Sequence, residues 1–339
     1  MKAAVIGAGP HGKRVIAALH EIPAVKLSAV VDKSEEALQT ARVPATVKKY
    51  RSAEDLWADG GAELVCITTN GPSHEPLAKA AIEAGSKHVL VEKPMGCSIA
   101  ECRRMLAKAR QLGVRLSVDQ SRRHDPMYQW LREKIRSGDW GQPRCIWVQR
   151  PGIGLGCLAT HSFDLATFLL GGAVRSVTAW VDKPIGKNPR GEEFVDPGGL
   201  VIMDMGPDMR AVISQIEDGA GPMAVEIDLT AARIRIDESF GIAEIIERDL
   251  SVRPGPGRPP AYSRIELPEG ISAKLSMPVM LKGVLTELIG DGPMLCDGVH
   301  GLAAIEVLVA AYVSNKSGHV PVSVPCESKE NCELWLPIT

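Results

Sequence analysis

The chain has 339 residues, of which 45% are hydrophobic and 24% charged, and 39 basic against 41 acidic side chains give a net charge of −2. This balance gives no electrostatic reason to expect nucleic acid or an anionic membrane as a partner. At about 100–200 residues per domain, the length predicts two domains. The first residues lack the pattern of a signal peptide, and no apolar run reaches the roughly 18–20 residues that span a bilayer, so we expect a soluble cytoplasmic protein.

Eight cysteines are spread along the chain without a C-x-x-C pair. Zinc sites need closer cysteine pairs or histidine-rich spacing, and disulfide scaffolds are far richer in cysteine. Cys97 and Cys102 form the closest grouping, and their helical spacing indicates packing rather than ligation. We therefore expect no structural metal. Aromatic residues make up only 4% of the chain, too few for a platform that stacks single-stranded nucleic acid.

The first 32 residues have the pattern of a strand, a glycine-rich turn, a helix and a second strand. An apolar run at 3–6 ends in the sequence GAGPHG at 7–12, and a second apolar run at 25–31 ends at Asp32, 20 residues beyond the last glycine of the turn. This arrangement predicts a dinucleotide site.

Each part of the glycine-rich turn has a physical purpose. Gly7 permits a tight turn, Gly9 lets the backbone approach a pyrophosphate, and Gly12 lets helix and strand pack closely. The helix N-terminus offers unpaired N–H groups and a partial positive charge to the phosphates. Asp32 can accept hydrogen bonds from both ribose hydroxyls and would repel a 2′-phosphate, so we expect NAD rather than NADP.

Helices and strands keep alternating to about residue 120, which predicts a doubly wound parallel sheet. Ligands of such sheets bind beyond the carboxyl ends of the strands, where polar residues stand here at 68–70, 92–93 and 119–120. Ser52 should cap the first of the helices that follow Asp32. The expected strands are 64–68, 88–91 and 114–118, and the expected longer helices are 76–84 and 99–112.

From about residue 122 the pattern becomes rich in strands. A helix should begin at Asp125-Pro126 and end at Gly138, and the segment 251–260, rich in Pro and Gly, should be a loop rather than a domain linker. Together these features predict an α/β chain with a dinucleotide-binding domain (1–121) and an α+β domain (122–339) built on a large, mainly antiparallel open sheet. The expected strands are 144–150, 174–181, 199–205, 211–217, 223–228, 233–237 and an edge strand at 320–324, and the expected helices are 162–170 and 302–312.

Several motifs, in this order, resemble the family of glucose–fructose oxidoreductase, inositol dehydrogenase and the rhizopine-catabolism dehydrogenases (Gfo/Idh/MocA). The resemblance implies an N-terminal Rossmann domain, NAD as cofactor, a sugar, cyclitol or related polar metabolite as substrate, and self-association as a homodimer or homotetramer through the open sheet. The motifs are Gly7–Gly12 with Asp32, Thr69 to His74, Val91-Glu92-Lys93-Pro94, Arg123-His124-Asp125-Pro126, Gly138-Asp139-Trp140-Gly141, Thr160-His161-Ser162-Phe163-Asp164-Leu165 and Asp297-Gly298.

The family pattern also implies roles for single residues. Lys93 would reach the substrate oxygen beside the nicotinamide, His161 would act as acid or base, and Asp164 would orient the site. Taking a hydride from an alcohol carbon requires a base for the hydroxyl proton. The implied cofactor contacts are Gly7, Gly9, Pro10, His11, Gly12, Asp32, Thr68, Thr69, Asn70, His74, Glu92, Lys93 and Gln120, and the implied substrate contacts are Cys157, Asp164 and Arg123.

Alternatives stay open at some of these positions. His74 either contacts a ligand or caps a helix, and Arg123 either grips an acidic substrate group or is a solvated charge. Glu92 and Pro94 would shape the turn around Lys93, for which a cis Lys93–Pro94 bond is one route.

One position departs from the family pattern. The inositol dehydrogenase branch has an aspartate four residues before the histidine, where this chain has Cys157. A thiol is a weak hydrogen-bonding group, so Cys157 either lines the pocket or serves as a reactive thiol. The glycine-rich run 152–156 indicates a close, flexible backbone near the substrate. Two other functions therefore stay open: a non-catalytic sensor of the same fold, and a reductase of an imine or conjugated ring.

Overall fold

The computed structural model describes the whole chain except residues 153, 253, 254, 256 and 258. The chain divides into two compact units, each made of more than one segment. Unit 1 comprises residues 1–124, 277–305 and 332–339, and unit 2 comprises 125–276 and 306–331. The expected division at 121/122 assigned everything beyond it to one domain, whereas the segments 277–305 and 332–339 pack with the N-terminal part of the chain.

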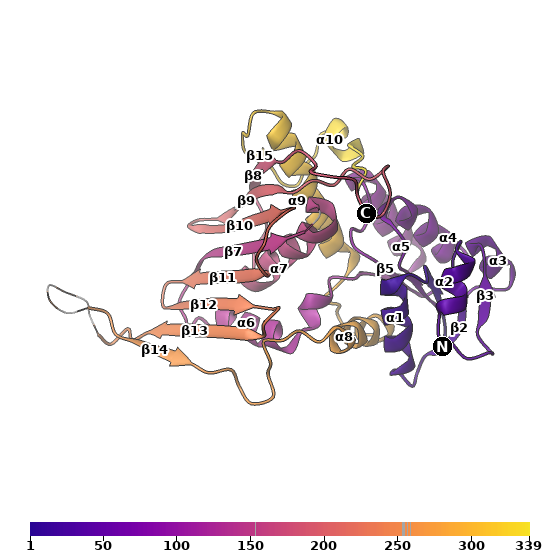
Figure 1. Cartoon of the computed structure of the whole chain (residues 1–339), viewed down its shortest axis with the longest axis horizontal. Helices are drawn as coiled ribbons and strands as arrows, with labels where there is room; N and C mark the ends of the chain where they lie inside the picture. The colour runs from indigo at the N-terminus through magenta and orange to yellow at the C-terminus, as the bar shows by residue number, and fades with distance from the viewer. Residues whose placement is uncertain (153, 253–254, 256, 258) are drawn as a thin grey trace. The chain divides into compact units, whose positions relative to one another are not determined.

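Unit 1 is built on a six-stranded parallel sheet with the strand order β3-β2-β1-β4-β5-β6 (Figure 1). From β1 the chain runs outward to β2 and β3, and it then returns to β4 on the other side of β1 and runs outward to β5 and β6. The strand order thus reverses between β1 and β4, and doubly wound sheets bind their ligands at such a point. The parallel sheet predicted from the sequence is confirmed. Its elements are β1 (Lys2–Ile6), α1 (Pro10–His20), β2 (Lys26–Val31), α2 (Glu35–Thr40), β3 (Lys48–Tyr50), α3 (Ala53–Ala58), β4 (Leu64–Ile67), η1 (Gly71–Ser73), α4 (His74–Glu83), β5 (His88–Val91), α5 (Ile99–Leu112), β6 (Arg115–Val118), η2 (Ser121–His124) and α8 (Met277–Ile289).

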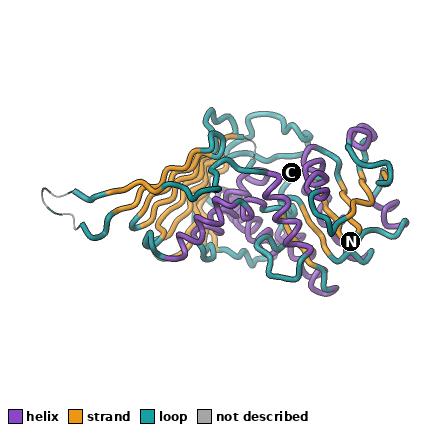
Figure 2. The backbone as a smooth tube through the Cα atoms, turned by 90° about the horizontal axis from the view of Figure 1, so that it is seen from below, coloured by secondary structure: helices purple, strands orange, loops and turns teal. Residues whose placement is uncertain are grey.

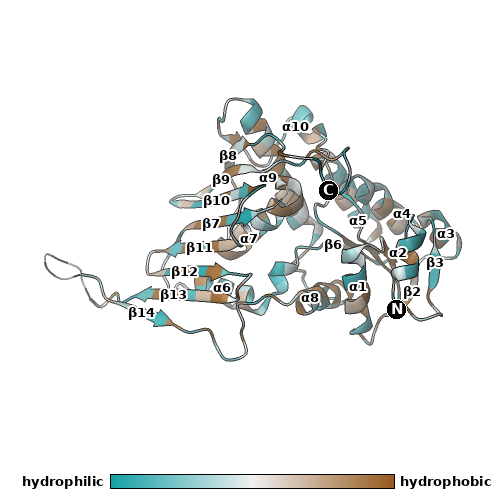
Figure 3. Cartoon of the chain, in the orientation of Figure 1, coloured by the Kyte–Doolittle hydropathy of each residue, from teal (hydrophilic) through white to brown (hydrophobic). Residues whose placement is uncertain are grey.

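Helix α8, which the sequence analysis did not predict, explains why a late segment belongs to unit 1. Leu281, Val284, Leu285 and Leu288 are fully buried in one core cluster with β1 and α1. Burying a leucine side chain contributes about 1.5–3 kcal/mol of stabilising free energy, so these contacts stabilise the packing of α8 against β1 and α1. Figure 3 shows the hydrophobic residues gathered on α8 beside α1.

The predicted helix ends are set by local hydrogen bonds. The Ser52 hydroxyl accepts from the Asp55 N–H, as expected of an N-cap. The Asp125 carboxylate accepts from the first N–H groups of α6 (Pro126–Ser137), and this helix ends at Gly138 in the left-handed region (φ 80°). Both predictions are confirmed.

Unit 2 contains a nine-stranded sheet with the order β14-β13-β12-β11-β7-β10-β9-β8-β15. Among the described strand pairs of this sheet only β7 and β10 are parallel, so the predicted mainly antiparallel sheet is confirmed. The sequence analysis missed β13 and β14, while β15 is an edge strand as predicted. The elements are α6 (Pro126–Ser137), β7 (Pro143–Pro151), η3 (Leu155–Ala159), α7 (Thr160–Leu170), β8 (Ser176–Val181), β9 (Gly199–Gly206), β10 (Met209–Ile216), β11 (Ala224–Leu229), β12 (Ala232–Asp237), β13 (Ile242–Arg248), β14 (Tyr262–Ile265) and β15 (Val322–Ser323); α9 (Gly298–Lys316) and α10 (Lys329–Glu333) each contribute to both units.

The two faces of this sheet differ. Helices lie along one face of the sheet in Figure 2, where α7 packs against β7, β10 and α6. Strand residues alternate between buried and exposed, as along β12. On β7 and β8 the exposed positions include Trp147 (46%) and Trp180 (41%). The loop predicted at 251–260 and the glycine-rich run at 152–156 contain the residues outside the description.

Helix α9 qualifies by length and composition as a membrane span, which the sequence analysis did not expect. Its apolar window has a mean hydropathy of 1.3 and is 56% buried within the structure. A mostly buried core helix passes the same test, so this finding is weak evidence for a membrane.

Candidate functional site

The glycine-rich turn between β1 and α1 has the geometry of a phosphate-binding loop. Gly7 adopts φ +104°, and a Cβ added to Gly12 would lie 1.9 Å from the Gly7 carbonyl oxygen. A Cβ on Gly9 would meet nothing within 4 Å, so this side of the turn is open to a ligand. Pro10 is the first residue of α1, whose N-terminus can bind an anion.

Asp32 is fixed beside this turn by two backbone donors. Its Oδ2 accepts from the Ala8 N–H at 2.6 Å, and its Oδ1 accepts from the Ser34 N–H at 2.8 Å. Each carboxylate oxygen keeps capacity for a further donor. The side chain can therefore accept ribose hydroxyls while it holds the loop in place.

The loop after β4 supports the same turn. The Thr68 hydroxyl donates to the Gly7 carbonyl at 2.8 Å, and the Thr69 hydroxyl accepts from Ser73 at 2.7 Å. Asn70 is exposed at the start of η1. Thr68 thus positions the glycine-rich turn through its side chain.

His74 begins α4 and is fully buried. Its Nδ1 lies 2.8 Å from the Pro94 carbonyl oxygen and its Nε2 lies 3.1 Å from that of Thr69. Burial lowers the pKa of this imidazole, although both carbonyls oppose that effect. Neither contact caps a helix: through the Thr69 and Pro94 carbonyls His74 joins the loops after β4 and β5, and its contact with a ligand stays a prediction.

Charged side chains converge at the carboxyl ends of β5 and β6. The Lys93–Pro94 bond is cis, and the buried Lys93 ammonium lies 3.9 Å from Glu92 Oε1. Asp119 follows β6, and its Oδ2 lies 2.8 Å from His11 Nε2 on the first turn of α1. The structure therefore brings His11, Glu92, Lys93 and Asp119 together within unit 1, and their contact with a cofactor stays a prediction.

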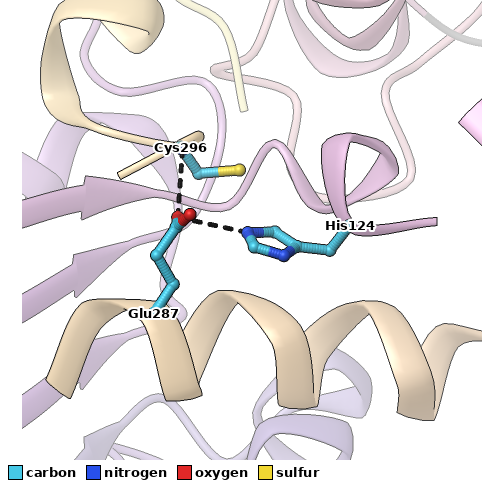
Figure 4. Close-up of side chains that lie close together, drawn as sticks. All are labelled: His124, Glu287 and Cys296. Carbon is cyan, nitrogen blue, oxygen red and sulfur yellow. Dashed lines mark hydrogen bonds and ion pairs between the residues drawn. The ribbon is translucent and has the colours of Figure 1, made fainter. Parts of the chain in front are cut away.

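Beyond β6, a second polar cluster joins η2 to α8 and the segment after it (Figure 4). Glu287 pairs with His124 at 3.2 Å and accepts from the N–H groups of Leu295 and Cys296. Burial opposes ionisation, but these donors outweigh it and lower the pKa of Glu287. The Cys296 thiol donates to the carbonyl of the buried Gln120 at 3.2 Å, which anchors the chain just after β6.

Arg123 belongs to the same region. The expectation of a solvated charge is wrong for this residue, because it is only 4% exposed and donates to the Leu295 carbonyl at 2.9 Å. A buried guanidinium requires such acceptors. Its contact with a substrate stays a prediction.

The candidate residues of unit 2 lie on one continuous helical segment. Cys157 is in the π-helical turn η3, and His161 and Asp164 are in the first turns of α7. Cys157 and Asp164 are buried. The Cys157 sulfur accepts from the Arg190 guanidinium at 2.8 Å, a contact that the sequence did not indicate.

Asp196 is the residue of this region that sequence reasoning missed. It is 4% exposed, and its two oxygens accept from the Gly156 and Cys157 N–H groups, each at 2.7 Å. A Cβ on Gly154 would lie 2.0 Å from Asp196 Oδ2. Burial, together with the Asp196 charge, raises the pKa of Tyr312. Asp196 therefore fixes the π-helical turn that precedes His161.

Comparison with known proteins gives a family for the first third of the chain. Residues 1–120 match the oxidoreductase family with an NAD-binding Rossmann fold. The uncharacterized oxidoreductase YrbE of Bacillus subtilis is 26% identical over 235 residues, 64% of this chain and 64% of that protein. The myo-inositol 2-dehydrogenase of Thermotoga maritima is 28% identical over 206 residues, 55% of this chain and 61% of that protein.

The fold extends over nearly the whole chain. The structure of the WlbA dehydrogenase from Bordetella pertussis, in complex with NADH and UDP-GlcNAcA, has a TM-score of 0.77 at 22% identity, covering 96% of this chain and 99% of that one. The matches to the two curated relatives span less than two thirds of their length. The comparisons therefore support the family of residues 1–120 more strongly than that of the rest of the chain.

Proposed function

We propose that this protein, whose residues 1–120 match the oxidoreductase family with an NAD-binding Rossmann fold, is an NAD-dependent oxidoreductase of the Gfo/Idh/MocA family. It transfers a hydride between the nicotinamide and a hydroxyl or carbonyl carbon of a sugar, cyclitol or related polar metabolite. The observation that carries the proposal is the placement of the buried Lys93 at the end of β5, in the same sheet whose β1 leads into the open glycine-rich turn.

NAD fits the residues that would hold it. The space beside Gly9 admits a pyrophosphate at the N-terminus of α1. The Asp32 carboxylate, fixed by the Ala8 and Ser34 N–H groups, would accept the ribose hydroxyls and repel a 2′-phosphate. When bound, NAD supplies the carbon that accepts or returns the hydride.

The chain's own residues would manage the proton. Removal of a hydride from an alcohol carbon requires loss of the hydroxyl proton. Lys93 of unit 1 and His161 of unit 2 are the proposed acid–base residues, and Asp164 is proposed to orient His161, since it follows three residues later on the same helix. Asp196 would position His161 through the preceding turn.

The substrate class rests on the named relatives. The myo-inositol 2-dehydrogenase acts on a cyclitol by name, and the WlbA dehydrogenase was crystallised with a sugar nucleotide. These proteins support a polyhydroxylated substrate for this chain. The decisive experiment incubates the purified protein with NAD⁺ and a panel of sugars, cyclitols and their acids, and follows the absorbance of reduced nicotinamide. Tight NAD binding without turnover of any panel member would refute this substrate class and favour a binding protein.

We also propose that the protein works as a cytoplasmic homodimer or homotetramer that binds no nucleic acid. None of the eight cysteines is in a disulfide, in keeping with a reducing compartment. The exposed face of the large sheet, which includes Trp147 and Trp180, is the proposed contact between copies. Sedimentation velocity would test this assembly, and a concentration-independent monomer would contradict it.

A further inference from the structure

Among residues 7–12 of the glycine-rich turn, only His11 has a titratable side chain. His11 is the second residue of α1 and points its Nε2 at Asp119 Oδ2, 2.8 Å away. The Asp119 side chain is only 2% exposed, against 23% for that of His11. Among the described residues, Asp119 Oδ1 has no hydrogen-bond partner. A buried carboxylate in this position is strongly destabilised unless a positive charge compensates it, and His11 is the titratable base paired with it.

The other charged groups that face His11 come from two strand ends. Glu92 and Lys93 follow β5, and Asp119 follows β6. The formal charges of Glu92, Asp119 and Lys93 sum to −1, so a neutral His11 leaves the cluster at −1 and an imidazolium brings it to zero. Burial lowers the pKa of His11, but the carboxylates of Glu92 and Asp119 outweigh burial and the opposing Lys93, and the pKa is raised above its ordinary value.

The position of His11 links this charge to an anion. Its backbone lies in the first turn of α1, where free N–H groups and the helix dipole favour a phosphate. A pyrophosphate carries two negative charges, so an imidazolium attracts it more strongly than a neutral imidazole does.

We propose that His11 and Asp119 form a proton-linked element of the dinucleotide site, in which the His11 imidazolium binds the cofactor's pyrophosphate and Asp119 keeps it charged. The inference rests on the proposed function, since it requires NAD to bind at this turn. Because the bound anion favours the protonated imidazole, NAD binding takes up protons, and affinity falls as the pH rises through the titration of His11. One such group changes the dissociation constant by at most about tenfold per pH unit.

The experiment measures NAD⁺ binding by isothermal titration calorimetry from about pH 5.5 to 8.5, a window around the ordinary titration of histidine. Buffers with different ionisation enthalpies give the number of protons taken up. His11→Gln keeps a hydrogen bond to Asp119 without a titratable charge, and Asp119→Asn removes the carboxylate's charge. His20→Gln is the matched control, because His20 ends the same helix and is exposed.

We expect the unmodified protein and His20→Gln to lose affinity about tenfold across this range, with up to one proton taken up. His11→Gln should bind with a pH-independent affinity equal to the weaker limit, and Asp119→Asn should shift the loss of affinity to lower pH. NMR titration of the histidine Cε1–H signals in the unmodified protein gives the His11 transition directly, and NAD should move it to higher pH.

Three results would overturn the proposal: pH-independent binding without proton uptake, an unchanged pH profile in His11→Gln, or a His11 transition that NAD does not move. Absence of NAD binding at every pH would instead refute the proposed function together with this inference.

Discussion

Alanine substitutions at two glycines of the same turn should separate folding from cofactor binding. A methyl group at Gly12 would lie 1.9 Å from the Gly7 carbonyl oxygen and 2.9 Å from Thr68 Oγ1. This carbonyl belongs to the backbone directly after β1 and is held by hydrogen bonds of Gly7 to Val31 and Thr68, so overpacking should cost about 1–3 kcal/mol. With about 2–4 °C of Tm per kcal/mol for a unit of this size, Gly12→Ala should unfold roughly 2–12 °C below the unmodified protein.

Gly9→Ala is the matched variant with the opposite outcome. Its new methyl meets no atom within 4 Å, and Gly9 already has φ −67°, which alanine adopts freely. Alanine is a poorer N-cap than glycine, which lowers the free energy of unfolding by about 0.5–1 kcal/mol. It also reduces the conformational entropy of the unfolded chain, which raises the free energy of unfolding by about 0.4–1 kcal/mol, so Tm should stay nearly constant. The methyl should nevertheless obstruct the pyrophosphate and weaken NAD binding at least about tenfold. Thermal unfolding by circular dichroism and NAD calorimetry measure both effects, and either an unchanged Tm in Gly12→Ala or unchanged NAD affinity in Gly9→Ala would refute this account of the turn.

Three further predictions concern the chemistry. Asp32→Ala should lose about 1.5–3 kcal/mol of NAD binding free energy for each charge-assisted bond to the ribose, before water compensates. Calorimetry that finds NADP bound as tightly as NAD by the unmodified protein would contradict the role assigned to Asp32. Lys93→Ala and His161→Asn should each lower kcat about 10²–10⁴-fold in steady-state kinetics, with NAD affinity nearly unchanged in His161→Asn, and unaltered kcat would remove that residue from the mechanism. Cys157→Ser should stay within about tenfold of normal activity, whereas near-total loss with Lys93→Ala still active would make the thiol the reactive group.

Local patterns predicted the parallel sheet of unit 1 closely. The strand His88–Val91 and the helix Ile99–Leu112 have the predicted bounds, because apolar periodicity and capping residues act within a few positions of the chain. The sequence also predicted that the second sheet is large and mainly antiparallel, since its strands alternate in hydrophobicity between the two faces.

Elements defined by distant contacts were missed. Helix α8 has no acidic residue in its first turn and no basic residue in its last. Its buried residues at 280, 281, 284, 285 and 288 do recur at helical spacing, which is the signal that could have indicated it. Asp196 stands in a segment without any motif, and its role arises when the chain returns to the Gly156 and Cys157 N–H groups, about 40 residues earlier.

In the cofactor region, too, contacts between residues far apart in the sequence could not be predicted. His11 and Asp119 are 108 residues apart in the sequence, and each is conspicuous on its own, one in a glycine-rich turn and the other at a strand end. Parallel strands bring their carboxyl ends to one edge of the sheet, so residues of different motifs become neighbours there. The charge of His11 then depends on Asp119 and Glu92, and the tolerance for a buried Asp119 depends on His11. Sequence motifs can therefore identify each residue of such a site, but the protonation that governs an anionic ligand belongs to the cluster.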